Sequence, residues 1–130
     1  MTQNDTLATT LSQIMNYERL GKRETMVKAN SALIRTVLTL LQNERYIGAF
    51  EIVPDGKTGI LKINLLGNIN KIGVIKPRFS VSMAEYEKFE KRYLPAKDFG
   101  VLIVSTSKGM MTHLEAKKMH LGGKLISYCY

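Results

Sequence analysis

The strongest constraint on the fold is a short apolar run, residues 101–104, that passes without a break into polar residues. Four consecutive apolar residues behind Gly100 predict a buried strand. Three hydroxyl residues, a lysine and a glycine follow it directly: Ser105, Thr106, Ser107, Lys108 and Gly109. Hydroxyl groups both donate and accept hydrogen bonds, so three in a row are poor core material. We therefore expect a rigid strand whose end holds these hydroxyls at the surface for a polar ligand.

Helical and strand patterns alternate through the first half of the chain. The patterns predict, in order, a helix over residues 5–19, a short link at 25–27, a helix from its N-cap Ser31 to just before Gly48, and strands over 49–53 and 60–65. Because both helices are amphipathic, each needs an apolar surface to cover, and the two strands supply one. Residues 1–70 are thus expected to form an N-terminal α/β subdomain with two helices on a small sheet.

The second half begins with a segment rich in glycine, asparagine and proline, which predicts an edge strand and a crossing between subdomains over residues 71–82. Ser82-x-x-Glu85 and Thr112-x-x-Glu115 have the form of a capping box, and each predicts the start of a short helix. Residues 124–130 read as a final strand. A C-terminal subdomain over 83–130 is therefore expected to be an antiparallel sheet with short helices, which makes the whole chain α+β.

The charge of the chain is strongly positive and unevenly placed. Nineteen lysines and arginines against 11 aspartates and glutamates give a net charge of +8. Residues 1–65 carry a net charge of +2 and residues 66–130 a net charge of +6. The positive field is thus concentrated on the half that also carries the hydroxyl residues, which favours a polyanionic partner. A solvated basic surface without a partner is the alternative.

Cysteine use and hydropathy predict the compartment. Cys129 is the only cysteine, so the chain forms no internal disulfide, as is usual in a reducing compartment. The chain has no apolar stretch of about 18 residues, and its N-terminus lacks the pattern of a signal peptide. We expect a soluble, cytoplasmic protein that does not bind a membrane.

Catalytic and metal-binding patterns are weak. Residues 55–58, Asp-Gly-Lys-Thr, resemble the end of a phosphate-binding loop, but Glu51 stands where such a loop has its first glycine. A serine hydrolase could use Ser105 or Ser107 with His113 or His120, yet no Gly-x-Ser-x-Gly pattern surrounds either serine. His113 and His120 are the only histidines, and with Cys129 they have no recognised metal-ligand spacing. We expect no enzyme activity, no metal and no cofactor.

Binding of RNA accounts for these features together. Five lysines surround the hydroxyl segment in the sequence and can attract phosphates: Lys97, Lys108, Lys117, Lys118 and Lys124. Hydroxyls can reach base edges and ribose hydroxyls, and Gly109, Gly122 and Gly123 would let backbone approach backbone. Gly122 and Gly123 are equally well explained as a helix stop and a strand start. A basic module that binds only protein is the remaining alternative.

Residues 100–117 resemble the signature of the ribosomal proteins numbered eight in the small subunit. The likeness lies in Ile103-Val104, Ser105-Thr106, Gly109, Met110-Met111 and Ala116-Lys117, and it extends over nearly the full chain. Other segments resemble the archaeal and eukaryotic branch of that family: Tyr46-Ile47-Gly48, residues 75–79, residues 94–100 and Gly122-Gly123-Lys124.

This resemblance implies a primary binder of small-subunit ribosomal RNA that recognises its central domain and helps to assemble the platform, beside neighbouring ribosomal proteins. Some relatives also bind their own messenger RNA. The main contacts implied are Ser105, Thr106 and Ser107 with Lys108 and Gly109, and Gly122, Gly123 and Lys124 in the same pocket. Weaker contacts are implied at Asp5 or Thr6 and from Lys28 to Ser31. Ala32 departs from the family pattern, which has a second basic residue there.

Overall fold

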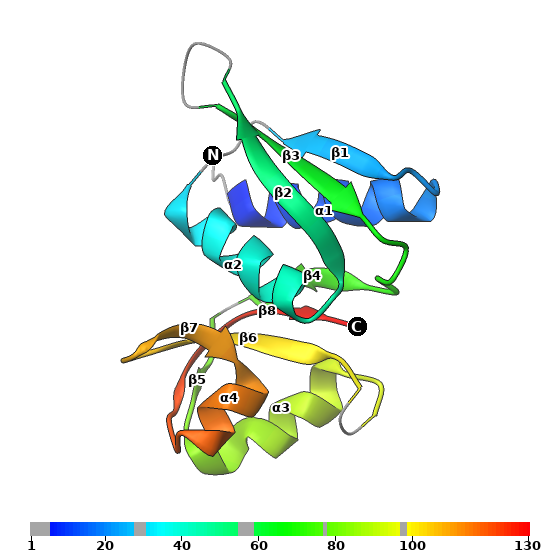
Figure 1. The fold of residues 1–130 in the computed structure, drawn as a ribbon. Coiled ribbons are helices and arrows are strands. Elements are labelled where there is room, and N and C mark those ends of the chain that lie inside the picture. The colour runs from blue at the N-terminus through cyan, green and yellow to red at the C-terminus, as the bar shows by residue number, and fades with distance from the viewer. Residues whose placement is uncertain (1–5, 28–30, 55–58, 77, 97–98) are drawn as a thin grey trace. The chain divides into compact units, whose positions relative to one another are not determined.

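The computed structural model describes the chain except residues 1–5, 28–30, 55–58, 77 and 97–98. It divides into two compact units, Met1–Ile69 and Asn70–Tyr130, each with its own sheet (Figure 1). Within the described residues, no helix is both long and apolar enough to cross a lipid bilayer. With helices and two antiparallel sheets, the chain has the predicted α+β fold.

The N-terminal unit contains two helices and three strands. These are α1 (Thr6–Arg19), β1 (Glu24–Val27), α2 (Ala32–Asn43), β2 (Ile47–Val53) and β3 (Ile60–Leu65). The strands form an antiparallel sheet in the order β1-β3-β2. Ser31 caps α2, because its hydroxyl accepts a hydrogen bond from the Ile34 amide at 3.2 Å. Buried leucine and isoleucine side chains from α1, α2 and β3 form the core of this unit.

One expectation in this unit was wrong. Residues 25–27 were expected to be a link, but they belong to β1, which pairs with β3 through Thr25↔Ile63 and Val27↔Leu61. Thr25 and Val27 are buried, and the residues between and before them are exposed. The strand is only four residues long, so it carries too little alternation to stand out from a loop in the sequence. The remaining helices and strands of this unit are present in the predicted order, but α2 ends at Asn43 rather than just before Gly48, and β2 begins at Ile47 rather than at residue 49.

The C-terminal unit contains five strands, two α-helices and a 3₁₀ turn. These are β4 (Ile72–Val74), β5 (Ser80–Val81), η1 (Met83–Glu85), α3 (Tyr86–Tyr93), β6 (Val101–Thr106), β7 (Gly109–Thr112), α4 (His113–Lys118) and β8 (Gly123–Cys129). The sheet has the order β4-β8-β6-β7, and β5 also pairs with β8. Helices α3 and α4 lie on one face of this sheet (Figure 1). Strand β8 therefore holds three other strands in place.

Two short helical segments begin at the predicted caps. The Ser82 amide and hydroxyl both donate to the Glu85 carboxylate, at 2.9 and 3.0 Å, which completes a capping box. The Thr112 hydroxyl accepts from the Glu115 amide at 3.3 Å and caps α4. These local hydrogen bonds satisfy amides that the helices cannot pair internally. The sequence patterns identified both helix starts correctly.

The hydroxyl residues follow the apolar run as predicted, at the end of a strand. Ser105 and Thr106 are the last two residues of β6. The strand continues because it pairs with β7, which the sequence did not predict. Only Ser107 and Lys108 connect the two strands. The hydroxyl segment is therefore a tight hairpin and not an extended loop.

Tyr86 ties α3 to the start of β8. Its ring is fully buried, and its hydroxyl donates to the Leu121 carbonyl at 2.8 Å. Burial raises the pKa of this phenol above its ordinary value of 10.0. The bond crosses 35 residues of sequence, so it fixes the backbone just before Gly122 and Gly123.

We predict that Tyr86→Phe lowers the free energy of unfolding by about 1 kcal/mol, because the Leu121 carbonyl loses its partner while the ring still fills the core. Urea unfolding monitored by circular dichroism measures this change. Tyr93→Phe is the matched control, since no hydrogen bond of the Tyr93 hydroxyl occurs among the described residues. Equal effects of the two substitutions would contradict the assigned role.

Candidate nucleic-acid interface

The hairpin between β6 and β7 is held by a side chain of its own. Thr106 pairs with Gly109 across the hairpin. The Thr106 hydroxyl donates to the Gly109 carbonyl at 2.7 Å and accepts from the Lys108 amide at 3.1 Å. Gly109 has a φ of +109°, a conformation that residues with a Cβ rarely adopt. The hairpin Ser105–Gly109, called here the hydroxyl hairpin, therefore has a defined shape without a ligand.

The three hydroxyls consequently have two different roles. Thr106 is partly buried and its hydroxyl is engaged within the hairpin. Ser105 and Ser107 are exposed, and neither hydroxyl has a hydrogen-bond partner in the described part of the chain. The hairpin thus presents two available hydroxyls on a frame that the third one stabilises.

The glycine pair lies next to the hydroxyl hairpin. Ser105 of β6 is paired with Lys124 of β8. A Cβ on Gly123 would overlap the Ser105 carbonyl oxygen, and one on Gly122 would lie 2.5 Å from the Val81 carbonyl oxygen. Real Cβ atoms do not approach backbone atoms so closely. Both glycines are thus required for β8 to approach its neighbours, and this approach brings Lys124 beside Ser105.

The cations around the hairpin are not equivalent. Lys108, Lys118 and Lys124 are exposed, and no ion pair of theirs occurs within the described residues. The Lys117 ammonium is different, because it forms a close ion pair with the Glu90 carboxylate of α3. Lys97 lies outside the described residues. Three of the five lysines that the sequence singled out are therefore exposed without an acidic partner.

A buried polar cluster next to the interface was not predicted. Glu90 and His113 are almost fully buried. The His113 Nε2 atom lies 3.0 Å from the Glu90 carboxylate, and its Nδ1 atom accepts a hydrogen bond from the Leu102 amide at 3.0 Å. Since that amide is a donor, the proton of a neutral His113 ring is on Nε2 and faces Glu90. The cluster joins α3, α4 and β6.

This cluster also bears on the hydrolase alternative. A catalytic histidine must offer a ring nitrogen to the serine that it activates. Both ring nitrogens of His113 are occupied by Leu102 and Glu90. The Nδ1 atom of His120 lies 3.2 Å from the Met83 sulfur. His113 therefore has no ring nitrogen left to offer Ser105 or Ser107 among the described residues.

The contacts implied for the N-terminal unit are only partly described. Asp5 and Lys28 lie outside the described residues, and so does the side chain of Thr6, the first residue of α1. Ser31 is half-buried, and its hydroxyl serves as the N-cap of α2. Ala32 is the exposed first residue of that helix. The described residues of this unit therefore form no site comparable to the hydroxyl hairpin.

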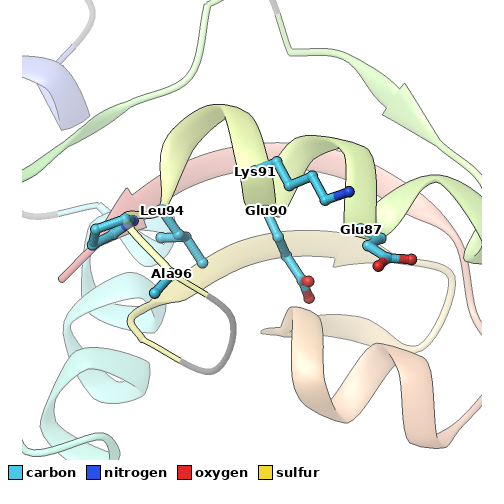
Figure 2. A pocket seen from close by; sticks show the side chains of 6 residues that line it. Glu87, Glu90, Lys91, Leu94 and Ala96 are labelled. Atoms are coloured by element: carbon cyan, nitrogen blue, oxygen red, sulfur yellow. The ribbon is translucent and has the colours of Figure 1, made fainter.

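A hollow on α3 has a different chemistry. Its volume is about 220 Å³, and it is lined by Glu87, Glu90, Lys91, Leu94, Pro95 and Ala96. Figure 2 shows the Glu87 and Glu90 carboxylates on one side of α3, with Glu90 directed toward α4. Because carboxylates repel phosphates, this side of α3 is poorly suited to a polyanion.

A two-sheet α+β protein with free hydroxyls and unpaired lysines on a rigid hairpin has the features of a nucleic-acid-binding protein. Residues 5–130 match the family described as Ribosomal protein S8, and the chain belongs to this family. It is accordingly a small-subunit ribosomal protein that binds ribosomal RNA. The resemblance predicted from the sequence is confirmed.

We predict that Thr106→Val opens the hairpin, because valine keeps the branched shape but makes neither of the two hydrogen bonds. The Lys108 amide should then exchange with solvent about fivefold faster or more, corresponding to about 1 kcal/mol or more of lost protection. Hydrogen exchange followed by nuclear magnetic resonance measures it. Thr106→Ser retains the hydroxyl and should retain most of the protection; equally fast exchange in both variants would refute the role.

We also predict that Lys117→Ala and Lys118→Ala differ in their effect on the free energy of unfolding. Lys117→Ala should destabilise the fold by about 1 kcal/mol, since it leaves the buried Glu90 carboxylate with less compensation. Lys118→Ala should change stability by less than about 0.5 kcal/mol, as is usual at an exposed position. Thermal unfolding of the two variants makes the comparison, and a larger loss for Lys118→Ala would contradict the ion-pair assignment.

Proposed function

We propose that this protein is a primary binder of the central domain of small-subunit ribosomal RNA and helps to assemble the platform of the subunit in the cytoplasm. The observation that carries the proposal is the pairing of Ser105 with Lys124 across β6 and β8, both without a side-chain partner among the described residues, beside the exposed Ser107 of the same hairpin. Family membership supports binding to ribosomal RNA. The geometry supports assigning the main contact to the C-terminal unit.

The proposed mechanism is recognition of shape and of hydroxyl groups in an irregular RNA helix. Ser105 and Ser107 have one donor and two acceptor positions each, which suit ribose hydroxyls and exposed base edges. Lys108 and Lys124 would neutralise phosphates on either side and set the register. The absence of a Cβ at Gly122 and Gly123 lets β8 approach its neighbours and so holds Lys124 beside Ser105. Thr106 contributes by holding the hairpin in shape.

The N-terminal unit would add weaker contacts. Asp5 or Thr6 at the start of α1, and Lys28 with Ser31 before α2, are the proposed positions. Support comes from the family resemblance and from the location of Ser31 at a helix N-terminus, where backbone amides favour phosphate. Because the Ser31 hydroxyl already caps α2, its contribution should be smaller than that of the hairpin serines. Ala32 removes a charge that relatives usually have there.

Two further kinds of partner are proposed for a small-subunit ribosomal protein of this family: other ribosomal proteins and its own messenger RNA. Neighbouring ribosomal proteins would contact this chain in the assembled subunit. Its own messenger RNA would bind if part of that RNA presents the same irregular shape to the hydroxyl hairpin. An unlabelled transcript of the message, used as a competitor against the ribosomal fragment, distinguishes shared recognition from separate sites.

We predict that Ser107→Ala and Ser105→Ala each weaken binding to a central-domain transcript by about fivefold to 100-fold, which corresponds to about 1 to 3 kcal/mol for a ribose or base group left without a partner. Binding to a regular RNA duplex of random sequence should be unaffected, because that binding rests on phosphates. Filter binding at fixed salt measures both.

Ser12→Ala provides the matched control, since Ser12 is an exposed serine of α1. Its affinity should equal that of the parent protein. If both hairpin variants bound the central-domain transcript as tightly as the Ser12 variant, the assignment of RNA recognition to the hairpin would be wrong. Failure of the parent protein to prefer this transcript over the duplex would refute the proposed primary binding.

A further inference from the structure

A row of aromatic rings lines the edge of the C-terminal sheet formed by β4 and β5. Phe79 precedes β5 and packs on Phe89 of α3, with ring centroids 5.4 Å apart. Tyr93 of α3 stacks on Tyr128 of β8 at 5.6 Å. We call these four rings the aromatic edge. Phe79, Tyr93 and Tyr128 are only partly buried, so the row is accessible to solvent along one side.

Arg92 lies over this row. Its guanidinium carbon is 5.0 Å from the centre of the Phe79 ring and 5.4 Å from that of Tyr93. The side chain is exposed, and no ion pair or hydrogen bond of its guanidinium occurs in the described part of the chain. Contacts with two rings hold the planar group in place, while its N–H donors remain available. Arg92 is therefore an ordered cation without an acidic partner.

Lys88 extends the positive charge by one helical turn. Its ammonium lies 5.6 Å from the centre of the Phe89 ring, and the residue is exposed. Glu85 is close enough that the Lys88 charge contributes to lowering the pKa of its carboxyl, although hydrogen bonds from Ser82 are the larger cause. The Ser82 hydrogen bonds keep Glu85 ionised, so Lys88 and Arg92 together exceed it by one positive charge on this side of α3.

The two sides of α3 thus differ in charge. Glu87 and Glu90 lie on the side that forms the hollow of Figure 2, together with Lys91. Lys88 and Arg92 lie on the side with the aromatic edge. Since residues four apart occupy the same face of a helix, the separation follows directly from the sequence of α3. The side with Lys88 and Arg92 is therefore the more favourable of the two for a polyanion.

The aromatic edge is distinct from the hydroxyl hairpin. β5 pairs with β8 at one edge of the sheet, while β7 lies at the other, beyond β6. Three strand spacings separate β5 from β7, which amounts to about 14 Å. Lys124 of the candidate interface lies between them, because it pairs with Ser105 of β6 on one side and with Ser80 of β5 on the other. Additive effects on binding are therefore expected between Arg92 and the turn residue Ser107, which share no contact.

We propose that Arg92 and Lys88, on the aromatic edge, form a second RNA contact of this protein, in which a phosphate is paired and an unpaired base stacks on the guanidinium plane of Arg92. Arginine planes and aromatic rings are the usual partners of unstacked bases in RNA. The proposal rests on the binding of ribosomal RNA and adds a site to it. Its ligand class is a bulged or single-stranded nucleotide next to a helix.

The test compares Arg92→Gln with Lys91→Gln, which removes the same charge from the other side of the same helix. The probe is a central-domain transcript of small-subunit RNA, measured by filter binding over a range of salt concentrations. Arg92→Gln should weaken binding about threefold to tenfold and reduce the logarithmic salt slope by about 1. Lys91→Gln should change affinity less than twofold. Thermal unfolding of both variants checks that the fold is retained.

Two further variants separate stacking from charge. Lys88→Gln should also reduce the salt slope, and it provides an independent measurement if Arg92→Gln fails to fold. Arg92→Lys keeps the charge but loses the plane, so it should retain the salt slope. Binding of a short single-stranded RNA, measured by fluorescence anisotropy, should still weaken with Arg92→Lys, because the base no longer has the guanidinium plane to stack on.

The outcomes separate this inference from the proposed function. If the parent protein prefers the transcript and the serine variants weaken it, but Arg92→Gln and Lys88→Gln bind like Lys91→Gln, the second contact is refuted and the hairpin assignment stands. If Arg92→Gln alters only the recovery of the protein with neighbouring ribosomal proteins, the edge binds protein and the inference is wrong. Additive losses in a Ser107→Ala and Arg92→Gln double variant support two separate contacts.

Discussion

The close backbone approach of β8 to β6 is the constraint on which the C-terminal unit depends. Gly123 meets the Ser105 carbonyl where any side chain would collide, and from this point β8 continues to pair with β6, β5 and β4. The candidate interface inherits its geometry from this contact, because Lys124 faces Ser105 only while the strands remain in register. The glycine pair, interpreted from the sequence as a helix stop and a strand start, does precede and begin β8, and the close strand approach requires it as well.

The buried cluster of Glu90, His113 and Lys117 extends the same dependence to the helices. Its hydrogen bonds and ion pairs connect α3 and α4 to the Leu102 amide of β6. Buried polar groups that are fully partnered favour one arrangement of their elements over others, because any slip leaves a charge or an amide unpaired. The ion pair with Lys117 partly neutralises the face of α3 that carries Glu90. Lys88 and Arg92 remain on the opposite face.

The sequence predicted the features that depend on local chemistry. Ser31, Ser82 and Thr112 were correctly read as helix caps, since a cap bonds amides only three residues away. The strands β1 and β7 were missed, because four residues show little periodicity and their pairing partners lie elsewhere in the chain. The pairing of Lys117 with Glu90 spans 27 residues, so no spacing rule could distinguish this lysine from exposed Lys118. The candidate site was predicted by residue type, and the roles within it required the tertiary contacts.

The hydrogen bonds of Thr106 fix the shape of the hydroxyl hairpin before any ligand binds. A loop that becomes ordered only on its ligand loses conformational entropy at that moment, and the loss subtracts from affinity. Here the Thr106 hydroxyl and the conformation of Gly109 fix the turn during folding, so that loss is incurred once, with the fold itself. If ribosomal RNA binds at this hairpin, as proposed, the conformational adjustment is then left to the RNA.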